Sequence, residues 1–260
     1  MEPFLNAALR RWMMALGAAV FAALAGCATV QSPDPRDPWE SFNRSVFEFN
    51  EGVDKAVLKP VATAYVDVVP TMMRTGVGNF FGNMADAWSF VNNVLQAKPE
   101  AALSSFWRVA INSTVGLGGV LDPASEMRLE KYREDFGQTL GYWGVPSGPY
   151  LVLPILGSFT LRDSLALPVD RYGYPLSHVN SDAWMYGLTV LGIVDVRARL
   201  LDASDLAEAA AIDPYTFRRE AYLQRRANRV GGGSSATEER YDLDPPPTAP
   251  IAAPSRIRIR

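Results

Sequence analysis

The sequence predicts a mainly α-helical single domain, and three observations support this fold class. Apolar residues recur at spacings of three and four along most of the region from residue 37 to 230. Strand signals are scarce, and only residues 150–154 fit a short paired strand. The region 37–230 also has the length of one domain and contains no visible repeat.

The segment before this domain has the features of a lipoprotein signal peptide. Arg10 and Arg11 precede an uncharged run from 12 to 24, which is too short to span a bilayer. The run ends in Leu-Ala-Gly-Cys, the pattern of a bacterial lipobox, so cleavage is expected between Gly26 and Cys27, with Cys27 acylated. An ordinary cleaved signal with a chance cysteine is the alternative. Residues 1–26 are then the signal peptide and 27–36 a tether, and Ala28 after the cysteine favours the outer membrane.

The first helix is expected to begin with Asp37 as N-cap and Pro38 at its first position. Apolar residues at 42, 46, 49, 53 and 57 form one face, and Pro60 is expected to end the helix. Thr71 is available to cap a second helix, in which seven large apolar residues from Met73 to Leu95 form one stripe. A third helix follows and runs to about residue 112.

Glycines 116, 118 and 119 then interrupt the helical pattern. Residues 133–143 fit a further helix closed by Gly144, and 146–154 fit irregular or extended chain. Residues 181–199 are predicted helical, and 215–229 are predicted to form a basic helix with a solvated face, or one that contacts anionic headgroups or a partner. Residues 231–260 are rich in Gly, Ser and Pro and are predicted to be a flexible, disordered tail.

Two of these helices are unusually apolar. Residues 183–194 hold no charge, and the helix at 71–96 has only two charged residues, Arg74 and Asp86. Such helices lie either in a protein core or in lipid, and both alternatives stay open at this point.

Composition excludes several classes of function. The net charge of −3 and the pI of about 5.3 argue against a nucleic-acid partner. One cysteine and one histidine, Cys27 and His178, cannot form a disulfide or a Cys/His zinc site, and no nucleotide or calcium motif occurs. A catalytic triad that uses His178 as its base is formally possible, but no Gly-x-Ser-x-Gly elbow occurs, so we expect no enzyme activity, no metal and no cofactor. Acidic residues at 134, 135, 163 and 170 fit either a carboxylate pair or caps and salt bridges.

A series of ordered motifs resembles the MlaA (VacJ) family of lipoproteins over about residues 24–229. The motifs, in chain order, are DPWESFNR at 37–44, FEFN at 47–50, Asp54, KP at 59–60, NFFGN at 79–83, VNNVLQ at 91–96, RxxxNSTxGxGGxxD at 108–122, EDFGQTLGxWGV at 134–145, GPYLVLP at 148–154, GSxTLRD at 157–163 and DPYxxxREAY at 213–222.

This resemblance implies a ring-like domain of amphipathic helices that lies in the inner leaflet of the outer membrane, beside a trimeric porin. It also implies an amphipathic channel that removes mislocalised phospholipids from the outer leaflet and passes them to an MlaC-like periplasmic lipid-binding protein. A structural lipoprotein that associates with porin and has no transport activity is the alternative. The candidate channel or hinge residues are Gly116, Gly118, Gly119, Gly141, Gly144, Arg162 and Asp163, the last two as headgroup contacts.

Overall fold

The computed structural model describes residues 34–231, so the predicted signal peptide, Cys27, most of the tether and the predicted tail lie outside the described residues. The elements, in chain order, are α2 (Glu40–Val53), the π-helical turn η1 (Asp54–Leu58), α3 (Lys59–Val68), α4 (Thr71–Leu95), α5 (Pro99–Thr114), α6 (Pro123–Glu126), α7 (Phe136–Tyr142), β1 (Tyr150–Leu153), β2 (Gly157–Thr160), α8 (Leu161–Gly173), the 3-10 turn η2 (Pro175–His178), α9 (Asp182–Arg199), α10 (Leu201–Ala210) and α11 (Pro214–Val230). The fold is mainly α, as the sequence predicts.

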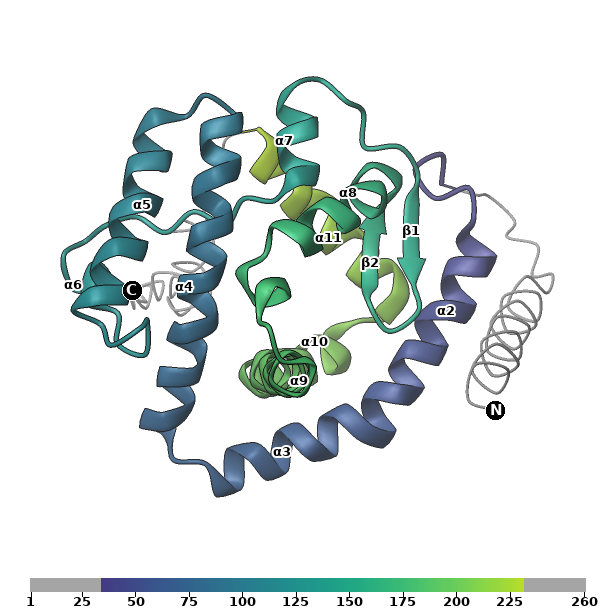
Figure 1. The fold of residues 1–260 in the computed structure, drawn as a ribbon. Coiled ribbons are helices and arrows are strands. Elements are labelled where there is room, and N and C mark those ends of the chain that lie inside the picture. The colour runs from purple at the N-terminus through teal and green to yellow at the C-terminus, as the bar shows by residue number, and fades with distance from the viewer. Residues whose placement is uncertain (1–33, 232–260) are drawn as a thin grey trace, which may run out of the picture.

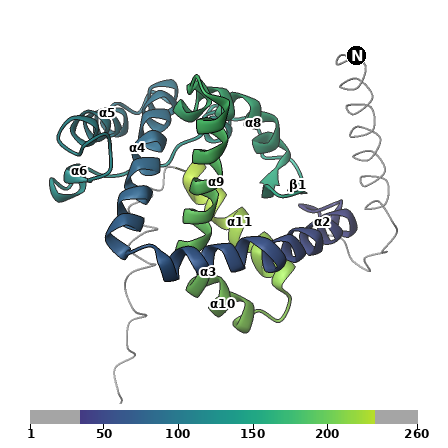
Figure 2. The same ribbon diagram turned by 60° about the horizontal axis from the view of Figure 1, so that its bottom comes forward.

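The helices form a frame around α9 (Figure 1). The continuous run of α2, η1 and α3 makes one edge of the frame, and α4 turns away from its end to make the next. Turning the molecule shows α9 lengthwise between α4 and α8, with α3 crossing its lower part (Figure 2). This arrangement agrees with the ring-like shape that the resemblance implies.

The first helix differs from its prediction at both ends. Asp37 is not its N-cap: α2 begins at Glu40, and the Asp37 carboxylate accepts hydrogen bonds from Asn43, Tyr215 and Arg219. Pro60 does not end the helical run, because the wide turn of η1 leads into α3 and places the proline in its first turn, where proline is tolerated.

The apolar stripe predicted for the second helix does not pack into a core: its residues are exposed or half-buried, and Trp88 lies on the inner side, where its indole donates to Asp170. None of its seven residues is fully buried, and Met73 is 62% exposed. The buried face of α4 is polar instead and carries Asn83, Asp86, Asn92 and Asn93. The helix also begins at Thr71 without the predicted side-chain cap. Its amphipathic pattern is therefore correct, but the polar side faces the protein.

Helix α9 also does not lie in a protein core, which was one of the two locations that its apolar sequence allowed. Only Val194, Asp195 and Ala198 of its residues are buried, whereas Trp184 is 69% exposed. Across the described residues, 21 polar or charged residues are buried against 13 apolar ones, six of which are alanine. Ordinary water-soluble domains bury the opposite mixture, so the outward apolar surface requires a non-aqueous neighbour or a partner.

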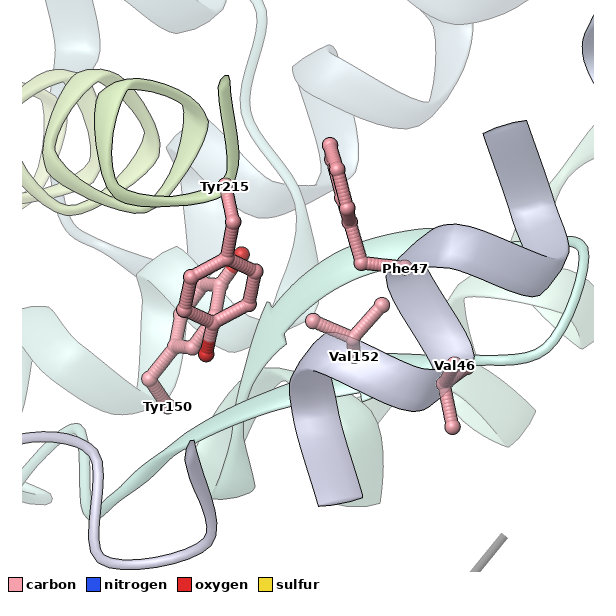
Figure 3. Packing of buried hydrophobic residues seen from close by; sticks show 5 residues of the cluster. All are labelled: Val46, Phe47, Tyr150, Val152 and Tyr215. Carbon is pink, nitrogen blue, oxygen red and sulfur yellow. The ribbon is translucent and has the colours of Figure 1, made fainter. Parts of the chain in front are cut away.

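One compact apolar cluster joins α2, the hairpin and α11. It is formed by Val46, Phe47, Tyr150, Val152 and Tyr215 (Figure 3). The Phe47 and Tyr215 rings meet edge to face, with centroids 5.6 Å apart. These side chains fasten both ends of the described chain to β1.

The hairpin contains the strand predicted at 150–154 and a second strand that the sequence analysis missed. β1 and β2 pair antiparallel, with Tyr150 opposite Thr160 and Leu153 opposite Gly157. The helix predicted from 133 starts later, because Asp135 accepts a hydrogen bond from the Gln138 amide and is its N-cap. Helices α8 and α10 were not predicted.

Candidate functional site

A cavity of about 870 Å³ lies between α8 and α9 and is here called the α8–α9 pocket. It is at the upper end of the size range of small-molecule pockets, about 300–1,000 Å³. Its lining residues are Leu58, Phe81, Trp88, Asp135, Leu156, Phe159, Asp163, Leu167, Asp170, Arg171, Tyr174, Leu176, Ser177, Met185, Leu188, Thr189, Gly192, Ile193, Val196, Arg197, Leu200, Tyr222 and Arg226.

One wall of the pocket follows directly from helical spacing. The lining residues of α9 are 185, 188, 189, 192, 193, 196 and 197, which recur at alternating intervals of three and one and therefore share one face. Most of them are apolar, and Gly192 lets the Phe81 ring of α4 approach α9 closely. The uncharged stretch 183–194 of this helix thus supplies most of an apolar wall.

The wall nearer α7 and α11 is polar, because Arg226 bridges two carboxylates there. Its Nε donates to Asp163 Oδ2 at 2.8 Å, and its Nη2 donates to Asp135 Oδ1 at 2.6 Å. The Tyr222 hydroxyl donates to Asp163 Oδ2 at 2.9 Å. This cluster ties α7, α8 and α11 together and gives the pocket fixed polar atoms beside the apolar wall.

The environment of the polar wall shifts the pKa values of its groups in different directions. Burial alone would raise the pKa of Asp163, but the hydrogen bond and positive charge of Arg226 outweigh it and hold that pKa below its ordinary value. Burial raises the pKa of Asp170, although the Phe136 amide and the Trp88 indole both donate to it. Burial raises the pKa of Tyr222 as well, beyond its ordinary range, so the phenol stays protonated.

Two glycines one turn apart in α7 make room for this cluster. A Cβ on Gly137 would lie 2.6 Å from both Arg226 Nη2 and Asp163 Oδ1, and one on Gly141 would lie 2.5 Å from Arg162 Nη1. Larger residues there would push the guanidinium groups away from their carboxylates. Gly141 therefore has a packing role, and its predicted role as a hinge stays a prediction.

The predicted headgroup residues occupy different positions. Asp163 lines the pocket, but Arg162 does not; the Arg162 side chain is buried and donates to the Val145 carbonyl oxygen and to Asp163 Oδ1. Arg162 Nη2 also lies 3.0 Å from Asp163 Oδ1, in an ion pair that is not aligned as a hydrogen bond. Direct contact of either residue with a headgroup stays a prediction.

The remaining predicted glycines lie outside the pocket lining. Gly116, Gly118 and Gly119 form the turn after α5, and φ at Gly119 is +94°. Gly144 follows α7 with φ of +89°. Positive φ explains glycine at Gly119 and Gly144 without any motion, so their role as hinges also stays a prediction.

A second buried polar cluster joins α4 to α5 away from the pocket. Arg108 Nε donates to Asp86 Oδ2 at 2.9 Å, and Arg108 Nη2 donates to Asp122 Oδ2 at 2.9 Å. Asn112 Nδ2 donates to Asp122 Oδ1 at 2.8 Å. This cluster accounts for Asp86 on the inner face of α4, because the buried carboxylate has a cationic partner.

The sequence analysis named Asp163 of α8, but it missed the other pocket-lining side chains of that helix and the role of α11. The basic helix was interpreted as solvated or as a surface contact, but Arg219 and Arg226 are buried in ion pairs with Asp37, Asp135 and Asp163. Of the two interpretations of the acidic residues, caps and salt bridges agree with the structure: Asp135 caps α7, and Glu134 accepts from Gln96.

His178 stands apart from these clusters. Its Nδ1 lies 3.0 Å from Ser177 Oγ, and its ring meets Tyr172 edge to face. Within residues 34–231, no group of three or more His, Cys, Asp or Glu side chains could hold a metal ion. In the same range, none of the helices combines the length and the apolar character needed to cross a bilayer.

Comparisons with known proteins agree on one family. The family model "MlaA lipoprotein" matches residues 35–229. The "Intermembrane phospholipid transport system lipoprotein MlaA" of Escherichia coli (strain K12) is 38% identical over 237 residues, covering 89% of this chain and 92% of that protein. The protein of the same name from Haemophilus influenzae is 37% identical, covering 81% and 87%.

A solved structure described as "Structural basis for maintenance of bacterial outer membrane lipid asymmetry" is similar in fold as well. It is 39% identical to this chain, with a TM-score of 0.65, and the match covers 73% of this chain and 96% of that one. The family match spans almost the whole described region, including every wall of the α8–α9 pocket, and the chain therefore belongs to the MlaA lipoprotein family.

Proposed function

We propose that this protein removes mislocalised phospholipids from the outer leaflet of the outer membrane by passing them through the α8–α9 pocket. The observation that carries this proposal is the pocket itself, which has an apolar helix face on one side and fixed charged groups on the other. A phospholipid has the same two halves, so one cavity serves both. The names of the Escherichia coli and Haemophilus influenzae relatives support phospholipid as the substrate.

The exposed surface supports a location in one leaflet. Trp184 and Val190 of α9 and Met73 and Val94 of α4 are all more than half exposed, so both helices present apolar side chains that the described residues leave uncovered. Amphipathic segments of this kind insert their apolar face about 5–10 Å into a membrane. The acyl chains on Cys27 hold the protein at the periplasmic face of the outer membrane, since more than one chain gives stable anchoring.

The proposed step needs no chemistry on the lipid. Phospholipid changes location but no covalent bond forms or breaks, so the protein is not an enzyme. A trimeric porin beside the frame and a periplasmic lipid-binding protein that receives the lipid are the proposed partners. Both follow from the family resemblance.

The test is to block the pocket without changing the rest of α9. Thr189 lines the pocket, whereas the adjacent Val190 does not and is 61% exposed. Thr189→Trp places an indole inside the cavity, and Val190→Trp places the same side chain outside the pocket lining as the matched control. Each variant is expressed in a Gram-negative host that lacks its own copy, with protein abundance checked by immunoblot.

Surface phosphatidylethanolamine is then labelled on intact cells with an amine-reactive reagent that does not cross the membrane. Wild type and Val190→Trp are expected to keep labelling low, and Thr189→Trp is expected to leave it as high as in the deletion strain. Equal clearance by all three proteins would contradict passage through this pocket. If Thr189→Trp and wild type also pull down porin equally, the structural-lipoprotein alternative would then be favoured. Cys27→Ala is expected to abolish labelling with radioactive palmitate.

A further inference from the structure

Three arginines line the α8–α9 pocket, and two of them are fully engaged by other residues. Arg226 bridges Asp135 and Asp163, as described above. Arg197 donates to both carboxylate oxygens of Asp54, at 2.7 and 2.8 Å. For Arg171, no hydrogen bond or ion pair of the side chain occurs with any residue in the described part of the chain.

Arg171 lies where it meets both solvent and the pocket. It is in the last turn of α8 and is exposed. Leu167 and Asp163 of α8, about one and two helical turns before it, line the same cavity, as does Tyr174 directly after the helix. Its guanidinium therefore belongs to a helix face that looks across the pocket toward the apolar stripe of α9.

The neighbouring carboxylate does not neutralise this arginine. Asp170 Oδ1 accepts from Trp88 Nε1 at 2.7 Å and from the Phe136 amide at 2.7 Å, so it is held by α4 and α7. A cation at the end of a helix gains a little from the helix dipole. Stabilisation by the helix dipole would explain an arginine at this position without any ligand, and it would not change when phosphate is added. A binding measurement with phosphate therefore distinguishes this explanation from a role in binding.

We propose that Arg171 binds the phosphate group of a phospholipid whose acyl chains lie against the apolar face of α9. This inference rests on the proposed function and names the contact that orients the lipid. A guanidinium donates two parallel hydrogen bonds to a phosphate, and its long apolar stem tolerates adjacent acyl chains. Inorganic phosphate shares the charged half of this chemistry but has nothing to place on the apolar wall.

The experiment separates phosphate recognition from acyl-chain binding. Full-length protein is purified in a mild detergent, depleted of lipid, and titrated with dimyristoyl phosphatidylglycerol or with dimyristoylglycerol, which has the same chains and no phosphate. Bound lipid is quantified by native mass spectrometry, and binding of inorganic phosphate alone is measured in parallel. Arg171→Gln is compared with Arg171→Lys, which keeps the positive charge but cannot donate two parallel hydrogen bonds to one phosphate. Arg128→Gln is the matched control, because Arg128 is exposed and lies outside the pocket lining.

Wild type is expected to bind phosphatidylglycerol more tightly than dimyristoylglycerol. Arg171→Gln is expected to weaken phosphatidylglycerol binding by about tenfold or more, to leave dimyristoylglycerol binding unchanged, and so to remove the preference. Arg171→Lys is expected to fall between, and Arg128→Gln to match wild type. Circular dichroism checks that all variants are folded.

Two results would overturn the proposal while leaving the pocket function intact. In one, Arg171→Gln binds phosphatidylglycerol as tightly as wild type does. In the other, Arg171→Gln loses only inorganic phosphate, which would make the residue a free-anion site. If wild type binds neither lipid, the proposed function itself fails, and the role of Arg171 fails with it.

Discussion

Replacing Arg108 with leucine removes the central cation of the buried cluster between α4 and α5. The Arg108 side chain is 1% exposed, and it donates to Asp86, Asp122, Ser125 and the Leu129 carbonyl oxygen at 2.9–3.2 Å. The leucine has similar apolar bulk but no donor. Asp86 and Asp122 would then face each other without their shared partner.

The expected loss is large because the carboxylates stay buried. Removing one partner of a buried ion pair costs about 3–5 kcal/mol, out of a total stability of about 5–15 kcal/mol for a domain. In a domain of 150–250 residues, 1 kcal/mol shifts Tm by about 2–4 °C, so Tm is expected to fall by roughly 6–20 °C. Arg218→Leu is the control: that arginine pairs with Glu51 while 53% exposed, and exposed pairs contribute about 1 kcal/mol or less.

The loss should also depend on pH in a defined direction. Burial raises the pKa of Asp86 above its ordinary value, while Lys131 and Arg108 oppose that rise. Without Arg108 the folded-state pKa rises further, so the folded state binds more protons than the unfolded state. The stability of the variant then decreases as pH rises from the unfolded-state pKa through the folded-state pKa of Asp86. The loss of stability relative to wild type should therefore be greater at pH 8 than at pH 5.

Thermal unfolding of the full chain in detergent, followed by circular dichroism, measures both effects. Adding Asp86→Asn to Arg108→Leu should recover part of the loss, because the uncompensated charge is removed. A Tm within 2 °C of wild type at both pH values would refute the reasoning, as would an equal deficit at pH 5 and pH 8.

Two further predictions concern α8 and the pocket wall. Gly173→Ala should destabilise the protein strongly, because its Cβ would lie 2.1 Å from the Trp88 ring. The Cβ of Gly187→Ala would have no atom within 4 Å, so this variant should raise stability by up to about 1 kcal/mol. Thermal unfolding compares the two variants, and equal Tm values would contradict the prediction. Asp163→Asn should lower stability at pH 7. Because the pKa of Asp163 is lowered in the folded state, its carboxylate stabilises the fold at pH values above its ordinary pKa near 4, and this stability is lost as pH falls through the folded-state pKa. The stability of the variant should therefore depend less on pH in that range than the stability of wild type does. An unchanged acid transition would exclude this contribution of the Arg226 pair.

Helices with long apolar periodicity could be predicted from the sequence, but their orientation could not. The stripe from Met73 to Leu95 correctly indicates a helix, because spacing depends only on the helical period. Spacing does not state whether the apolar face meets a protein core or a lipid. The structure makes that distinction, because it places Asn92 and Asp86 on the buried side of the helix.

The elements that were missed either contain a local helix breaker or depend on distant contacts. Helix α8 contains Pro168, which interrupts the pattern of an ordinary helix. The hairpin is fixed by Asn43, whose side chain bonds the backbone of Tyr150 and Val152 more than 100 residues away. The pocket wall requires Arg226 to reach Asp163 across 63 positions of sequence, a pairing that no local pattern encodes.

The same reliance on polar contacts explains how an open pocket is compatible with a stable fold. Apolar side chains hold helices together by filling the space between them, so a frame joined only in that way would tend to collapse into its cavity. Here the joints around the pocket are directional instead: Arg197 to Asp54 joins α9 to η1, Arg226 to Asp163 joins α11 to α8, and Trp88 to Asp170 joins α4 to α8. Each joint fixes a distance between two elements without filling the space beside it. In the proposed leaflet location, the outer apolar faces gain their stabilisation from lipid and not from the interior, so the interior is left available for the substrate.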